Sequence, residues 1–299
     1  VGSEMCIRDR DLFMNPRNRK ILFGSLLLLV IIVGLITFTL RQGKSKSTSV
    51  SKIVKIGLMP GGKQEDAIWK QVQKNAKDQF GITLKFVNFT DGDQPNKALA
   101  NHEVDLNAFQ HYAYLKSWNK ANNGNIVSIG DTIITPIHLY STKYKNVTEI
   151  PDKSTIAIPN DVTNESRALY VLKNAGLIKL DTSRGALATV KDITDNPKGL
   201  IIKEIDASQT PRALDSVAAA VINYNFAISA KISDKESIYQ EPLNEDSAQW
   251  INFIAANQSD KNNKVYKEVV KAYEQKNIAD TIKKEYPDGG ELPAWNLKL

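Results

Sequence analysis

The stretch STIAIPNDVTNESRAL, Ser154–Leu169, contains the change of local structure that decides the fold. It begins with a short run of β-branched and apolar residues, which predicts a strand. The Asn- and Asp-rich turn that follows leads into a helical pattern that starts near Asn164 or Glu165. A strand that passes directly into a helix is the repeating unit of α/β proteins, so this stretch predicts an α/β fold.

The same unit recurs along most of the chain. Apolar runs predict strands at residues 55–59, 82–89, 104–109, 126–130, 135–141, 154–159, 200–206, 217–223 and 250–256. Helical spacing predicts helices at residues 64–80, 96–101, 112–121, 165–177, 210–216 and 265–286. This order favours one or two mostly parallel sheets with helices on both faces. Ligands of such sheets bind beyond the carboxyl ends of the strands, where the helices begin.

The N-terminal region predicts a membrane anchor. Ile21–Leu40 is an uncharged, mostly apolar run that as a helix would be about 30 Å long, the thickness of the bilayer hydrocarbon. Neither a small-x-small site nor a lipoprotein cysteine follows it, so we expect an uncleaved signal anchor, with cleavage at an atypical site as the alternative. Residues 1–20 would form a cytoplasmic tail, of which 1–13 are interpreted as a translation artefact, and residues 41–52 a flexible tether. The remaining body would lie at the cell membrane, on its extracytoplasmic face.

Charge and cysteine content exclude several classes of function. The net charge of +6 arises in residues 1–52, whereas residues 53–299 carry 30 basic and 30 acidic side chains. The body therefore lacks the basic excess of a nucleic-acid-binding surface, and we expect no nucleic-acid partner. Cys6 is the single cysteine, so the body can form neither a disulfide nor a thiolate metal site.

Sequence motifs for catalysis are also missing. The turn GGKQ at residues 61–64 lacks P-loop spacing, and there is no GxGxxG after a strand and no GxSxG elbow. The histidines at positions 102, 111 and 138 do not have the spacing of a metal site. We therefore expect a binding protein without a cofactor or metal, and not an enzyme.

Polar side chains at the predicted strand ends indicate a small-molecule site. Arg167 would lie in the first turn of its helix, where a cation opposes the helix dipole unless it faces a bound anion such as a carboxylate. A surface ion pair of Arg167 with Glu165 or Asp161 is the alternative interpretation. Asn223 and Asn225 follow an apolar strand and are interpreted either as ligand-binding amides or as turn-forming residues.

His111 occupies a similar position after the strand that ends at Phe109. A histidine at a helix N-terminus is expected to be neutral and therefore to act as a hydrogen-bonding group. The sequence leaves two interpretations open, a pocket residue or a structural histidine. Together these strand ends predict a pocket for a small zwitterion.

The body, from about Ile53 to Trp295, resembles the methionine-binding lipoproteins of ABC importers, the NlpA/MetQ type. The matching motifs, in order, are KIGLMPGG (55–62), PNKALANHEVDLNAFQHYAYL (95–115), IPNDVTNESRALYVLKNAGLIKL (158–180), NPKGLIIKEIDASQTPRALDSVAAAVIN (196–223) and WIN (250–252). The resemblance implies a two-lobed periplasmic-binding-protein fold of the second type, with residues 53–135 and 245–299 as lobe 1 and 136–244 as lobe 2. It also implies a monomer that binds methionine between the lobes and delivers it to an ABC permease and ATPase complex.

The resemblance assigns roles to individual residues. Arg167 would pair with the ligand carboxylate, while Asn223 and Asn252 hold the backbone groups of the amino acid. Phe109 and His111 would face the ligand side chain, and we expect Tyr112 or Tyr114 to pack behind the helix. The predicted ligand-binding set also includes Asn164, Phe89 and Asn225.

Two departures from the family pattern concern the ligand. Gly92 stands where methionine binders usually carry an aromatic residue, and Thr135 replaces the tyrosine of a common Tyr-Pro pair. Both changes predict a roomier pocket. A different apolar amino acid or a methionine-containing dipeptide is therefore an alternative ligand, and a surface protein without a transport role is an alternative function.

Overall fold

The computed structural model describes residues 52–297 of the chain. The expected cytoplasmic tail, the signal anchor at residues 21–40 and all but the last residue of the tether lie outside this range. Within residues 52–297, no helix is long and apolar enough to cross a bilayer.

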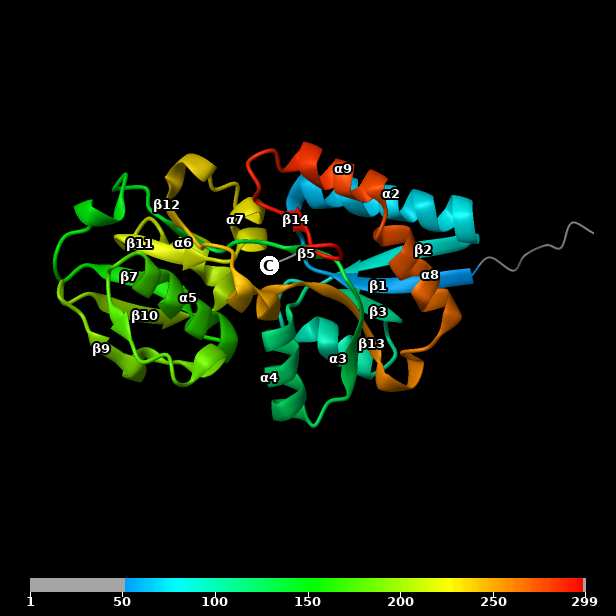
Figure 1. Ribbon diagram of the computed structural model, residues 1–299, viewed down its shortest axis with the longest axis horizontal. Coiled ribbons are helices and arrows are strands. Elements are labelled where there is room, and N and C mark those ends of the chain that lie inside the picture. The colour runs from blue at the N-terminus through cyan, green and yellow to red at the C-terminus, as the bar shows by residue number, and fades with distance from the viewer. Residues whose placement is uncertain (1–51, 298–299) are drawn as a thin grey trace, which may run out of the picture. The chain divides into compact units, whose positions relative to one another are not determined.

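Two five-stranded sheets form the framework of this part of the chain (Figure 1). The first contains, in spatial order, β2 (Ile82–Asn88), β1 (Lys52–Leu58), β3 (Leu106–Ala108), β13 (Phe253–Asn257) and β4 (Ile126–Asp131). The second contains β10 (Ile201–Ile205), β7 (Thr155–Pro159), β11 (Ala219–Ile222), β6 (His138–Tyr140) and β12 (Ser237–Gln240). Two short pairs complete the strands: β5 (Ile133–Ile134) with β14 (Leu292–Pro293), and β8 (Lys179–Leu180) with β9 (Ile193–Asp195).

The sheets are mostly parallel, as the alternation of strands and helices predicts. In the first sheet β1 runs parallel to β2 and β3, and β13 is antiparallel to both of its neighbours. In the second sheet β7 runs parallel to β10 and β11, and β6 is antiparallel to both of its neighbours. The chain passes from the first sheet to the second before β6 and returns before β13. The reversed strand in each sheet is thus the first one after a crossing.

Helices cover both faces of each sheet (Figure 1). On the first sheet, α2 (Gly62–Phe80), α8 (Lys264–Tyr273) and α9 (Lys276–Glu285) bury one face, while α3 (Gln94–Ala100) and α4 (Tyr112–Asn122) bury the other. On the second, α5 (Val162–Asn174) packs on one face, and α6 (Thr210–Ala213) and α7 (Tyr224–Ser229) on the other. The alternation of strand side chains produces this arrangement, since Ile156 and Ile158 of β7 face α5 and Ala157 faces the opposite core.

The structure corrects several predicted boundaries. Helix α5 begins at Val162, because the Asp161 side chain accepts the backbone N–H of Asn164 and caps the helix. Arg167 is therefore in the second turn and not in the first, so the argument from the helix dipole was wrong. The C-terminal helix predicted at 265–286 is divided into α8 and α9, with extended backbone at Gln275. Helix α7 and strand β12 were not predicted.

Candidate functional site

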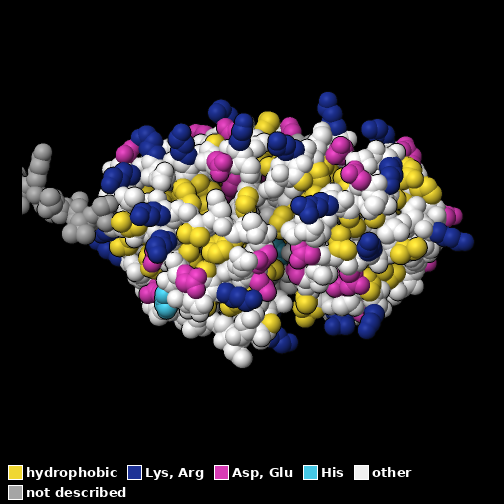
Figure 2. Space-filling view, turned by 180° about the vertical axis from the view of Figure 1, so that it is seen from behind, with side chains coloured by type: hydrophobic (Ala, Val, Ile, Leu, Met, Phe, Trp, Pro, Cys, Tyr) yellow, Lys and Arg dark blue, Asp and Glu magenta, His cyan; other side chains and the backbone are white. Residues whose placement is uncertain are grey.

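A cavity of about 650 Å³ lies where the ends of the two sheets meet. Its lining comes from the loops and helix starts that follow the strands of both sheets, and from the segment that connects β5 with β6. On the face shown in Figure 2, acidic side chains lie on both sides of a hollow near the middle of the molecule. The cavity brings together most of the predicted ligand-binding residues: Phe109, His111, Asn164, Arg167, Asn223, Asn225 and Asn252.

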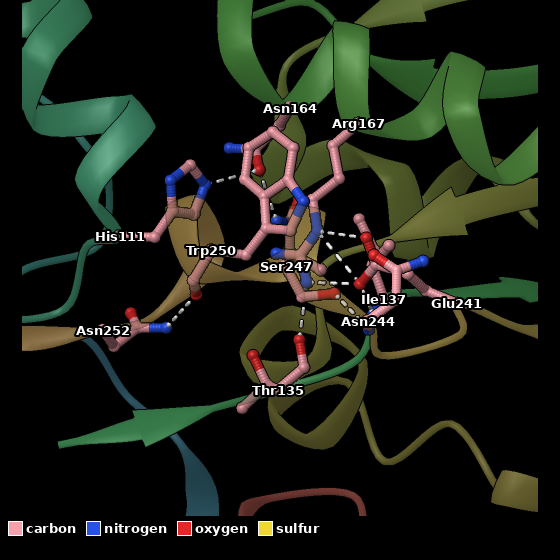
Figure 3. Close-up of polar contacts among 11 residues, drawn as sticks. His111, Thr135, Ile137, Asn164, Arg167, Glu241, Asn244, Ser247, Trp250 and Asn252 are labelled. Atoms are coloured by element: carbon pink, nitrogen blue, oxygen red, sulfur yellow. Dashed lines mark hydrogen bonds and ion pairs between the residues drawn. The ribbon is translucent and has the colours of Figure 1, made fainter. Parts of the chain in front are cut away.

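A chain of hydrogen bonds joins three of these residues across the two sheets, and Figure 3 shows its first link, from His111 to Asn164. His111 caps α4, and its Nδ1 accepts the backbone N–H of Tyr114 at 3.1 Å. The proton of the neutral ring is therefore on Nε2, which donates to Oδ1 of Asn164 at 3.2 Å. The same oxygen accepts Nδ2 of Asn223 at 2.9 Å. This leaves Oδ1 of Asn223, a residue of the cavity lining, as a buried acceptor without a hydrogen-bond partner within residues 52–297.

The environment of His111 keeps its ring neutral. The side chain is 6% exposed, and burial, with a smaller contribution from the cationic Arg167, lowers its pKa from 6.5 to about 3. The hydrogen bond to Asn164 opposes this shift without reversing it. The expected neutrality of His111 is thus a consequence of burial more than of the helix N-terminus.

Arg167 is buried beside Glu241, a residue that the sequence did not single out. The two side chains are 3% and 8% exposed, and Nε of Arg167 donates to Oε1 and Oε2 of Glu241 at 2.9 and 3.1 Å. Its Nη2 also contacts Glu241 and donates to the carbonyl oxygen of Thr135 at 2.8 Å. The surface ion pair with Glu165 is therefore excluded, since Glu165 accepts the backbone N–H of Val190 instead.

Trp250 lies between Arg167 and His111 (Figure 3). The guanidinium carbon of Arg167 is 4.9 Å from the centre of the Trp250 ring, within the range of a cation–π contact. The ring of His111 meets the other side of Trp250 edge-on at 5.0 Å. Trp250 therefore links a cation held by the second sheet to a histidine held by the first.

The aromatic wall of the cavity differs from the prediction. Tyr114 lines the cavity and meets Phe109 edge-on at 5.9 Å, so it does not pack behind the helix. A Cβ at Gly92 would lie 3.0 Å from the Tyr114 hydroxyl, which means that Tyr114 fills part of the space left by the missing aromatic residue. Tyr112 does pack away from the cavity, against Phe253.

Phe89 and Asn252 complete the predicted set. Phe89 does not line the cavity, since its ring lies against Gly57, where a Cβ would come within 3.0 Å of it. Asn252 forms an antiparallel bridge with His111, and its Nδ2 contacts the carbonyl oxygen of Trp250 at 3.4 Å. The backbone of Asn252 is therefore fixed against the start of α4 on the cavity wall.

Most of the carboxylates in the cavity lie near Tyr114, where Lys97 also pairs with Asp93 at 3.4 Å. Arg167 is at one part of the lining, whereas four carboxylates surround Tyr114, those of Asp91, Asp93, Asp161 and Asp206. Burial, followed by the field of these carboxylates, raises the pKa of Tyr114, so its hydroxyl stays protonated. Burial also raises the pKa of Asp161, although hydrogen bonds from Asn164 and Thr163 oppose the shift.

Comparison with known proteins decides the family. The model of the NlpA lipoprotein family matches residues 54–295. This chain belongs to the NlpA lipoprotein family. It is 37% identical over 245 residues to the D-methionine-binding lipoprotein MetQ of Escherichia coli K12, a match that covers 81% of this chain and 88% of that protein.

Solved structures of the family have the same fold. The substrate-binding protein of a methionine transporter from Streptococcus pneumoniae is 47% identical, with a TM-score of 0.76 over 81% of this chain and 96% of that one. A nutrient-binding protein from Burkholderia cenocepacia, bound to methionine, is 40% identical, with a TM-score of 0.76 over 81% and 99% of the two chains. The NlpA family consists of substrate-binding proteins, so this chain is not an enzyme.

Neither Glu241 nor Trp250 was assigned to this site from the sequence, although Trp250 belongs to the WIN motif. Glu241 and Trp250 lie in the return connection between β12 and β13, outside any regular strand or long helix. One general argument points to a residue such as Glu241, because an arginine buried in a protein requires an acidic partner. Among the described residues, no group of three or more His, Cys, Asp or Glu side chains is arranged to hold a metal ion.

Proposed function

We propose that this protein is the extracytoplasmic substrate-binding component of an ABC importer and that methionine is its ligand. The proposal is carried by one observation: a buried guanidinium and a buried, unpaired amide oxygen line the same cavity, at Arg167 and Asn223. A guanidinium donates charge-assisted hydrogen bonds to a carboxylate, and an amide oxygen accepts a hydrogen bond from an ammonium group. The names of the relatives, which are methionine-binding proteins, support the choice of ligand.

In this proposal most of the predicted residues have a defined role. Arg167 binds the ligand carboxylate, while Asn223 and Asn252 bind the backbone groups of the amino acid. Phe109 faces the ligand side chain, where aromatic rings contact a thioether favourably. His111 acts mainly through Asn164, because its Nε2 is used in the hydrogen bond that orients the Asn164 and Asn223 amides.

The proposal extends to the arrangement of the chain. Residues 53–135 with 245–299 would form lobe 1 and residues 136–244 lobe 2, and the two lobes would close on the ligand by hinge motion at the connections between the sheets. Residues 21–40 would anchor a monomer in the cell membrane, with the body outside and next to its permease and ATPase. A cavity of about 650 Å³ leaves room beyond a single amino acid, which keeps a methionine-containing dipeptide as a second candidate.

Calorimetric titration of residues 51–299, which form one compact unit, tests the proposal. The ligands are L- and D-methionine, the other amino acids and Gly-Met. A Kd below 1 mM for methionine, an interaction stronger than about 4 kcal/mol, is expected; the absence of such binding for every ligand would refute the proposed function.

A matched pair of variants tests the role of Arg167. Arg167→Lys keeps the charge but not the planar fork, and we expect it to raise the Kd about tenfold or more. Arg184→Lys makes the same change at an arginine whose side chain is 55% exposed, and should leave the Kd unchanged. Equal affinities of the two variants would contradict the assigned role.

A further inference from the structure

The guanidinium of Arg167 has one edge that is occupied and one nitrogen that is not. Its Nε and Nη2 are used by Glu241 and by the carbonyl oxygen of Thr135. No hydrogen bond to Nη1 is formed within residues 52–297, although Arg167 lines the cavity. The occupied edge therefore determines which nitrogen is presented to a ligand.

Glu241 links the Nε and Nη2 edge of Arg167 to both connections between the sheets. Its carboxylate accepts the backbone N–H of Ile137 at 3.1 Å, and its own N–H donates to the carbonyl oxygen of Ile137 at 2.9 Å. Thr135 and Ile137 belong to the outward connection from β5 to β6, and Glu241 begins the return connection after β12. The orientation of the guanidinium is thus set relative to both segments that any closing motion of the two sheets must use.

The contact with Trp250 cannot set this orientation by itself. The guanidinium carbon of Arg167 lies over the Trp250 ring, 4.9 Å from its centre. A cation–π contact depends on the charge above the ring and leaves the group free to rotate in its own plane. The contact with Glu241 is directional, because Nε and Nη2 of Arg167 donate to the two carboxylate oxygens as a bidentate pair.

We propose that Glu241 is a positioning residue for ligand binding, which holds one edge of Arg167 against the two connections so that Nη1 meets the ligand carboxylate. Glu241 does not touch the ligand in this arrangement. The inference rests on the proposed function, since it takes an amino-acid carboxylate as the partner of Arg167.

Three roles of Glu241 predict different signs for one measurable ratio. The ratio is the Kd of the carboxamide of the ligand divided by the Kd of the ligand itself, and it isolates the contribution of the carboxylate. A positioning role predicts that Glu241→Gln lowers the ratio. If Glu241 only offset the charge of Arg167, its removal would strengthen carboxylate binding and raise the ratio. If Glu241 served folding alone, the ratio would not change.

The experiment titrates the protein with the best ligand of the amino-acid panel and with its carboxamide. We expect Glu241→Gln to lower the ratio about tenfold while the Kd of the carboxamide changes little. Glu241→Asp retains the charge on a shorter side chain and should give an intermediate ratio; it also serves if Glu241→Gln does not fold. Glu204→Gln, at an exposed position on the same sheet, should leave the ratio as in the wild type.

The outcomes separate this inference from the proposed function. If the wild type binds no amino acid, the proposed function fails and the inference fails with it. If the wild type binds but the ratio in Glu241→Gln is unchanged or raised, the inference alone is overturned.

Discussion

Replacing His111 should change how the stability of the protein depends on pH. In the folded protein, burial lowers the pKa of His111 to about 3, whereas the unfolded chain has the ordinary value of 6.5. Between these two values the unfolded chain binds a proton at this site and the folded protein does not. The free energy of unfolding therefore falls as the pH is lowered below 6.5.

The magnitude follows from the width of this interval. Each pH unit within this interval lowers the free energy of unfolding by about 1.4 kcal/mol. Acidification from pH 6.5 to about pH 4.5 therefore lowers it by roughly 3 kcal/mol through His111 alone. Burial also lowers the pKa of His138, to about 4, so this residue contributes a similar loss in the wild type. His111→Asn should remove the first contribution and leave the second, while asparagine still caps α4.

Urea denaturation of the protein without added ligand, at pH 7.5 and pH 4.5, measures both losses. We expect the acid-induced loss of unfolding free energy to be smaller in His111→Asn than in the wild type by about 2–3 kcal/mol. His102→Asn is the matched control, because His102 is exposed and has a positive φ of 58°, which asparagine tolerates. An equal or larger acid-induced loss in His111→Asn would refute the reasoning.

Three further changes have defined outcomes. Gly92→Phe should raise the Kd for the amino-acid ligand about tenfold in a calorimetric titration, because the Tyr114 hydroxyl occupies the space beside Gly92. The double variant Gly92→Phe, Tyr114→Ala should recover binding, and full affinity of Gly92→Phe alone would contradict the reasoning. Gly290→Ala should lower the free energy of unfolding by about 1–3 kcal/mol in urea denaturation, because the added Cβ would lie 2.2 Å from the Tyr224 hydroxyl. Unchanged stability would show that this contact can relax. Burial raises the pKa of Glu65 from 4.5 to about 7, so the folded protein is stabilised by this proton at low pH and loses that stabilisation as the pH rises through the interval. Between about pH 5 and pH 8, the free energy of unfolding of Glu65→Gln should therefore fall by about 2–3 kcal/mol less than that of the wild type. An equal fall in both proteins would be the contrary result.

Local patterns were sufficient for most of the fold. The strands and helices of the α/β framework were predicted because apolar residues alternate or recur at helical spacing wherever an element packs on a core. Gly81 ends α2 in the left-handed conformation, with φ of 67°, directly after the predicted helix at residues 64–80. The prediction of a single C-terminal helix was wrong. Apolar residues recur on both sides of residues 274 and 275, but the backbone leaves the helix there.

The candidate site was predictable in part. Asn223 and Arg167 were singled out because they follow the carboxyl ends of predicted strands, where ligands of α/β proteins bind. The position of Tyr114 was not predictable, since a residue of an amphipathic helix can face either a cavity or a core. Phe89 was assigned to the pocket, yet its ring is directed to Gly57, a contact that depends on how β1 and the following loop meet.

The sequence by itself determined the type of most of the longer elements, the strand ends that precede Arg167 and Asn223, and the absence of motifs for catalysis. Only the tertiary structure decided that Glu241 faces Arg167 and that Trp250 lies between Arg167 and His111. The physical reason is the distance along the chain. Periodicity and capping depend on residues a few positions apart, whereas Arg167 and Glu241 are 74 positions apart. The burial of that ion pair depends on two connections that meet only after both sheets have formed.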